Sequence, residues 1–172
     1  MKRALLVALC AGVSGVASVS AQANAAVGAD AVVVTTGMTI TKLSDLNFGT
    51  VIKGVSTTVL PTAVNAGEWQ VSGSGNAFVV ISFTLPTTLT NIQALPGSTM
   101  PISFNATSAI WRRATNNPAG GNVFNPAVGA VGRLGPPPNL SMYIWLGGTV
   151  NPALTAKPGI YRGNVVVSLI YQ

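Results

Sequence analysis

The side chains with catalytic potential are few. The chain of 172 residues has three carboxylates, Asp30, Asp45 and Glu68, one cysteine, Cys10, and no histidine. Two facing carboxylates could hydrolyse a glycoside, but the stretches SDLNFG and AGEWQ around Asp45 and Glu68 are typical of a solvated bend and a strand start. The missing histidines exclude the usual triads and most zinc sites. We therefore predict no enzymatic activity, no cofactor and no metal.

Aromatic residues offer a second kind of chemistry, the stacking of rings against a sugar or a peptide. In LSMYIWL the rings of Tyr143 and Trp145 alternate with apolar side chains and therefore point to the other face of an extended strand. That face could be a binding platform, or the rings could pack under a loop or against a neighbouring subunit. The full candidate set is Trp69, Trp111, Tyr143, Trp145 and Tyr161.

Charge is scarce. Nine Lys and Arg residues face three acids, and charged residues make up 7% of the chain, against an average of about 25% in globular domains. Only Arg112 and Arg113 place two cations side by side, so the clustered cations of a nucleic-acid surface are absent and no nucleic-acid partner is expected. A free monomer with so little charge is poorly protected against association.

The first 25 residues have the pattern of a signal peptide. Lys2 and Arg3 precede an apolar run, and a small-x-small cleavage site follows at 21–23 or 23–25. We expect export to the periplasm and then to the cell surface or the medium. No later stretch reaches the ~18 apolar residues of a spanning helix, so no stable membrane span is expected. Cys10 lies inside the signal peptide, so residues 26–172 are expected to form a single domain without a disulfide.

The remaining pattern is that of short strands separated by Gly, Pro, Asn and Ser. In LNFGTVIKG, Gly49 shifts the two-residue period, which predicts a β-bulge. Residues 77–85 are apolar almost throughout, which predicts a strand covered on both faces. The expected strands are 31–43, 46–51, 57–60, 68–71, 77–85, 100–107, 140–146 and 163–172.

This pattern predicts an all-β fold, a single antiparallel β-sandwich, with a closed barrel as the alternative. Residues 112–139 contain two Asn-Pro steps, Gly120-Gly121 and three consecutive prolines, which predicts one long loop, either a binding arm or a floppy insertion.

The C-terminal sequence GNVVVSLIYQ predicts a final strand with apolar residues on both faces. Such a strand should be covered on both faces. Because Asn164 to Tyr171 includes no charge, its edge also lacks the guards that block pairing with another chain. One face would carry Val165, Val167, Leu169 and Tyr171.

Three motifs carry a resemblance: LNFG after the first strand, LGG at 146–148 and PGIYRGNVVVSLIY at 158–171. Their order resembles secreted bacterial β-sandwich domains of unknown function, similar to spore-coat-U-like proteins and chaperone–usher pilins. The resemblance implies an immunoglobulin-like sandwich lacking one strand, which a periplasmic chaperone and then a neighbour's N-terminal strand complete. The pilin disulfide is absent, and Gly37 falls out of phase with the implied donor residues. By motif, the recognition strand is Val165, Val167, Leu169 and Tyr171, and the donor residues are Val32, Val34, Met38 and Ile40.

These features together predict an exported structural subunit of a surface fibre or coat. Its partners would be further copies or other pilus or coat subunits, with a periplasmic chaperone in transit. The alternative is a monomeric secreted sandwich that binds a carbohydrate or peptide through its aromatic face and the loop at 112–139.

Overall fold

In the computed structural model, residues 37–93 and 98–172 are described, and every regular element among them is a strand. The expected signal peptide, Asp30, Val32 and Val34 lie outside the described residues. All pairings are antiparallel. The strands are β1 (Thr39–Ser44), β2 (Thr57–Val59), β3 (Gly67–Ser72), β4 (Phe78–Thr84), β5 (Thr88–Asn91), β6 (Thr99–Ser103), β7 (Ala109–Arg113), β8 (Asn122–Phe124), β9 (Ala130–Arg133), β10 (Ser141–Leu146), β11 (Gly148–Val150), β12 (Tyr161–Arg162) and β13 (Val166–Tyr171).

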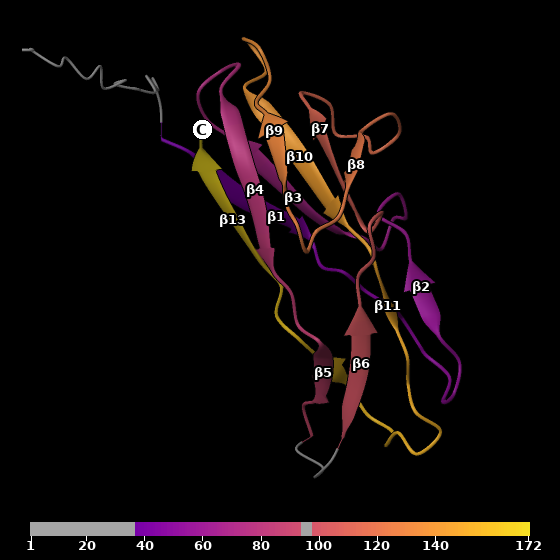
Figure 1. Cartoon of the computed structure of the whole chain (residues 1–172). Coiled ribbons are helices and arrows are strands. Elements are labelled where there is room, and N and C mark those ends of the chain that lie inside the picture. The colour runs from indigo at the N-terminus through magenta and orange to yellow at the C-terminus, as the bar shows by residue number, and fades with distance from the viewer. Residues whose placement is uncertain (1–36, 94–97) are drawn as a thin grey trace, which may run out of the picture. The chain divides into compact units, whose positions relative to one another are not determined.

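Hydrogen bonding groups the strands into three sheets (Figure 1). The strand orders are β1-β3-β10-β7-β8, β12-β5-β6-β11-β2 and β13-β4-β9. The chain passes from the second sheet to the other two through short connections. A few residues join β10 of the first sheet to β11 of the second, and a few join β4 and β13 of the third sheet to β5 and β12 of the second. Pro86 lies in the first of these junctions, where a residue without an N–H interrupts the ladder.

The main core lies between the first and third sheets. Val71 of β3 and Met142 and Ile144 of β10 meet Val79 and Ile81 of β4, all with no exposed surface. Sheets buried against each other in this way form a sandwich. The predicted all-β antiparallel β-sandwich is therefore confirmed.

A second, smaller core belongs to the second sheet. Its buried members are Met100 and Ile102 of β6 and Val150 of β11. The partly buried side chains around them include Phe48 and Tyr161, which come from the two ends of the described chain. This core has three buried members against six in the main one, so it is the thinner part of the fold.

The predicted β-bulge at Gly49 is wrong. Residues 45–50 form no strand. Instead, Gly49 donates its N–H to Oδ1 of Asn47 at 2.8 Å, and its φ of 64° lies in the left-handed region. An Asx turn closed by the side chain of Asn47 replaces the ladder, which is the local alternative that asparagine offers to a strand.

The prediction that residues 77–85 are covered on both faces is also wrong. Val79 and Ile81 are buried, but Phe78, the first residue of β4, is 51% exposed, and Val80, between the two buried residues, is also exposed. The sheet β13-β4-β9 packs one face on the main core, and its other face stays open in the described part of the chain. Apolar composition alone does not show whether a second layer covers a strand.

Residues 112–139 are not one long loop, as was predicted. The segment holds the end of β7 and the whole of β8 and β9. Its turns are closed by asparagine side chains: Oδ1 of Asn117 accepts the N–H of Ala119 at 2.8 Å, and Oδ1 of Asn125 accepts the N–H of Ala127 at 3.0 Å. The Asn-Pro steps are therefore turn formers between short strands.

Candidate functional site

The C-terminal strand β13 follows the predicted alternation. It pairs with β4 from Val166↔Thr84 to Tyr171↔Val79. Val167, Leu169 and Tyr171 pack against the main core, whereas Val166 and Ile170 face outward and are 50% and 68% exposed. The prediction that both faces of this strand are covered is therefore wrong, because the open face of β4 extends across β13.

Each of the three sheets has two terminal strands among the described residues. The C-terminal strands β12 and β13 are both terminal, each in its own sheet. β12 and β13 follow each other in the chain, so residues 161–171 present one long edge. An edge with a single charged residue, here Arg162, is the kind of template that β-strand addition uses.

A groove of about 1200 Å³ lies beside this edge. One of its walls comes from the first described strand and the turn after it, residues 42–53, and the other comes from residues 156–166. Its apolar lining includes Trp69, Leu89, Met100, Ile102 and Val150. Three of these five side chains are the buried members of the second core, so the groove opens directly onto that core.

The groove is lined by four cations, Lys42, Lys53, Lys157 and Arg162, and by one carboxylate, Asp45. Nζ of Lys42 lies 2.7 Å from Oδ1 of Asp45, and both side chains are largely exposed. Within residues 37–93 and 98–172, that is the one ion pair, so the other three cations have no carboxylate partner there. The groove therefore combines an apolar lining with a net positive charge.

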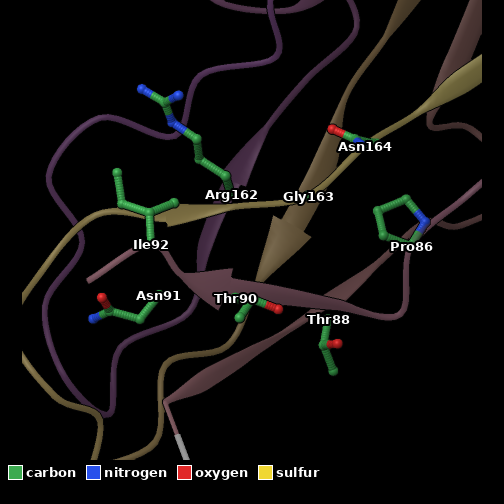
Figure 2. A pocket seen from close by; sticks show the side chains of 8 residues that line it. All are labelled: Pro86, Thr88, Thr90, Asn91, Ile92, Arg162, Gly163 and Asn164. Carbon is green, nitrogen blue, oxygen red and sulfur yellow. The ribbon is translucent and has the colours of Figure 1, made fainter. Parts of the chain in front are cut away.

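A smaller hollow of about 390 Å³ shares Pro86, Arg162, Gly163 and Asn164 with the groove. In Figure 2, Arg162 and Asn164 project from the C-terminal segment on one side, and Thr88 projects on the other. The buried Asn91 below them donates from Nδ2 to the carbonyl of Pro158 at 3.3 Å and accepts the N–H of Gln93 at 2.9 Å. These bonds hold the segment before β12 against β5, and they fix the groove wall.

The implied donor residues divide into two groups. Met38 packs against the main core, and Ile40 lies in β1 opposite Val71. Both belong to the domain's own sheet, so donating them would break the ladder between β1 and β3. The donor assignment stays a prediction for all four residues, of which Val32 and Val34 lie outside the described residues.

The two described carboxylates do not face each other across a pocket. Glu68 lies in β3 opposite Ser44, and Asp45 follows Ser44. Asp45 lines the groove and is paired with Lys42, whereas Glu68 does not line it. No cluster of three His, Cys, Asp or Glu side chains suited to a metal ion occurs in the described segments. Among the same residues, no helix has the length and apolar character that crossing a membrane requires.

The predicted aromatic platform is not formed. Tyr143 and Trp145 stack at 6.1 Å between ring centroids, but Trp145 is only 4% exposed. Trp69 meets Phe83 edge-on at 5.8 Å and packs with Trp111 against the main core. Tyr161 lines the groove, as Trp69 also does, and its hydroxyl donates to the carbonyl of Lys157 at 2.7 Å. Sequence reasoning missed the groove itself, because its walls lie more than a hundred residues apart in the chain.

Comparison with known proteins gives a family but no function. A search of curated proteins finds no match to this chain. A family described as a domain of unknown function, DUF4402, matches residues 38–171, which include every strand of the structure. The match begins at Met38, the residue before β1, so the extension 26–36 lies outside it. The chain belongs to the DUF4402 family.

Proposed function

We propose that this protein is an exported structural subunit of a bacterial surface fibre or coat, which assembles by accepting a strand from another chain into the groove between residues 42–53 and 156–166. The single observation that supports this most is the apolar lining of the groove. Met100, Ile102 and Val150 are core residues of the second sheet, yet they line a groove of about 1200 Å³. These three side chains are already buried, so an extended segment laid there would lie over this core and cover the exposed Ile160 and Val166, which also line the groove.

The edge beside the groove supplies the second requirement for strand addition. β12 and β13 are terminal strands of their sheets among the described residues, and their outer edge carries one charged residue, Arg162. A partner strand gains main-chain hydrogen bonds from such an edge and specificity from its alternate side chains. This arrangement supports the proposed kinship with chaperone–usher pilins and spore-coat-U-like proteins, and with it a periplasmic chaperone that binds the same edge before assembly.

A monomeric secreted domain that binds carbohydrate or peptide remains the second candidate. The groove, with Tyr161 and four cations, is the feature that favours it. The buried Trp145 and the absence of a long loop at 112–139 remove the two features on which the sequence argument for this candidate relied.

The size of the exported protein separates the two candidates. Sedimentation velocity of the protein purified from the periplasm or medium should show multimers that grow with concentration. The matched control is the same chain with Leu89→Asp, which places a charge in the groove at a partly buried position. Its circular dichroism is measured first to establish that it is folded. A wild-type protein that stays monomeric at every concentration would argue for the ligand-binding domain.

A further inference from the structure

We infer that the open outer face of the sheet β13-β4-β9 is a self-association surface, on which a second copy of this chain packs the same face about a two-fold axis. In Figure 1, β4 lies between β13 and β9. The outer face carries Ile170 of β13, Phe78 and Val80 of β4 and Val131 of β9, and all four side chains are exposed. None of them lines the groove, so this contact is separate from the strand addition proposed above.

A row of three β-branched side chains crosses the middle of this face. Val80 pairs with Ile170 on one side and with Val131 on the other. The neighbours of Val80 in β4, Val79 and Ile81, point the other way and are buried in the main core. The largest exposed apolar patch of a monomer is typically about 300–600 Å² and is often functional. The row is therefore the natural centre of a contact.

The two ends of the face differ in size, and this difference suits a second copy. Phe78, two residues before Val80, pairs with Arg133, whose Cζ lies 5.0 Å from the centroid of the ring. Ser82, two residues after Val80, pairs with Ser168 and donates from its Oγ to the carbonyl of Ser168 at 3.3 Å. A two-fold axis along the row reverses the strand direction, so the ring of each copy lies over the serine pair of the other. Large side chains then face small ones, as close packing of two sheets requires.

The charge of the face also fits this arrangement. Arg133 is the one charged residue of the three strands, and its Nε donates to the carbonyl of Asn76 at 2.9 Å, which holds it at the end of the face. The row of Phe78 and the row of Ser82 are separated by about 13 Å along the strands. The two-fold axis therefore keeps the two Arg133 side chains at least that far apart. This distance exceeds the screening length of about 10 Å at 0.1 M salt, so like charge does not oppose the contact.

The size of the face sets the strength of the contact. Three strands of six residues or so cover at most about 300 Å², whereas a standard interface buries about 800 Å² on each partner. Two isolated copies should therefore associate weakly and reversibly. In a fibre the same contact is repeated along the length, and linked weak contacts hold far more strongly than one alone. The inferred role of the face is to hold neighbouring fibres of a coat side by side.

A charge pair on the axis tests the inference. The tests use the full chain with Leu89→Asp, so that a charge in the groove blocks strand addition. Sedimentation equilibrium of this chain should show a dimer at high concentration and nothing larger, because a two-fold contact closes at two copies. Val80 faces its own copy across the axis, so Val80→Lys and Val80→Glu should each lower the association constant by roughly tenfold or more. An equimolar mixture of the two variants should dimerise again.

Salt distinguishes the apolar contact from the engineered charge pair. In ~1 M sodium chloride the screening length falls to about 3 Å. The dimer of the mixed Val80 variants should then weaken. The dimer of the Leu89→Asp chain with the native Val80 should persist, because its contact is apolar.

Two further variants serve as controls. Val123→Lys changes an exposed strand valine of β8 in another sheet and should leave the dimer unchanged. Val131→Thr combined with Ile170→Thr keeps the β-branched shape that suits a strand and should also weaken the dimer. Circular dichroism of every variant establishes first that it is folded.

The contrary outcomes separate this inference from the proposed function. A Leu89→Asp chain that stays monomeric at every concentration overturns the inference, while multimers of the wild type that grow with concentration still support strand addition. A wild type that stops at the dimer supports the inference and removes strand addition. Equal effects of Val80→Lys and Val123→Lys, or no recovery in the mixture, overturn the two-fold contact. Binding of a monomer to phosphatidylcholine vesicles that is lost in the double Thr variant would assign the face to a lipid surface and overturn the inference.

Discussion

The hydroxyl of Tyr171 accepts a hydrogen bond from the backbone N–H of Ser74 at 2.9 Å. This bond joins the last residue of β13 to the chain just beyond β3, which belongs to the facing sheet. Gly73 lies between the end of β3 and Ser74. A Cβ at that position would fall on the Tyr171 hydroxyl and within 3.1 Å of Leu134. The penultimate residue of the chain is thus fixed by both sheets of the sandwich.

Tyr171→Phe should lower the free energy of unfolding by about 1 kcal/mol or more, because the hydrogen bond to Ser74 is lost while the ring remains. Tyr171→Ala should cost about 3–5 kcal/mol, since the ring packs against the main core. Urea unfolding measures both. Tyr143→Phe is the matched control, because the contact of Tyr143 with Trp145 involves the ring and not the hydroxyl. Equal losses for the two Phe variants would contradict the role of the Ser74 contact.

Shortening a side chain should reduce stability more on the inner face of β13 than on its outer face. Leu169→Ala removes a side chain packed on the main core and should cost about 2–4 kcal/mol. Ile170→Ala, at a position that is 68% exposed, should cost less than about 1 kcal/mol in the monomer. Thermal unfolding of the two variants side by side measures the difference. A loss for Ile170→Ala as large as for Leu169→Ala would show that the outer face of the sheet is covered.

Steric crowding explains why the LGG motif has a glycine at position 147, and a substitution can test this explanation. Gly147 links β10 to β11, and a Cβ there would fall on the carbonyl oxygen of Val59 and within 2.7 Å of the nitrogen of Pro61. Gly147→Ala should therefore displace the end of β2 and cost about 1–3 kcal/mol or more. Gly37→Ala is the control, because its Cβ would meet nothing within 4 Å. Comparable melting temperatures for the two variants would refute the steric account.

Trp145 should act as a core residue and not as a ligand platform. Trp145→Ala should lower the free energy of unfolding by about 3–5 kcal/mol. Arrays of neutral polysaccharides should show the same binding for the wild type and for Tyr143→Ala, whose ring stacks on Trp145. Loss of a specific glycan signal in Tyr143→Ala, with the protein still folded, would restore the aromatic platform.

The sequence was informative where a local pattern settles the structure. The alternation of Val167, Leu169 and Tyr171 predicts the buried face of β13 because strand side chains point to opposite faces in turn. The turns at Asn117 and Asn125 also have a local signal, the Asn-Pro steps and the glycines near them. The high proline content of residues 112–139 nevertheless favoured the prediction of one long loop over short strands joined by turns.

Other features have no local signal. Whether a second layer covers Phe78 and Val80 depends on the number of sheets on that side, and both a covered and an open strand are compatible with the same apolar run. Lys53 and Lys157 both line the groove although they are far apart in the chain, so neither residue marks the site alone. Both the open face of β4 and the groove depend on how distant parts of the chain pack together.

Cysteine cross-linking tests the central claim most directly, because the chain has no cysteine after Cys10. One copy carries Val34→Cys and another carries Asn164→Cys, which lines the groove, and both are expressed in the same periplasm. A disulfide needs Cα atoms within about 7 Å, so a strand held in the groove should give a linked dimer on a non-reducing gel. The control replaces Asn164→Cys with Val64→Cys, at a fully exposed position that does not line the groove. Linked dimers with Asn164→Cys and none with Val64→Cys are the predicted result; no linkage, or equal linkage at both positions, would contradict the account.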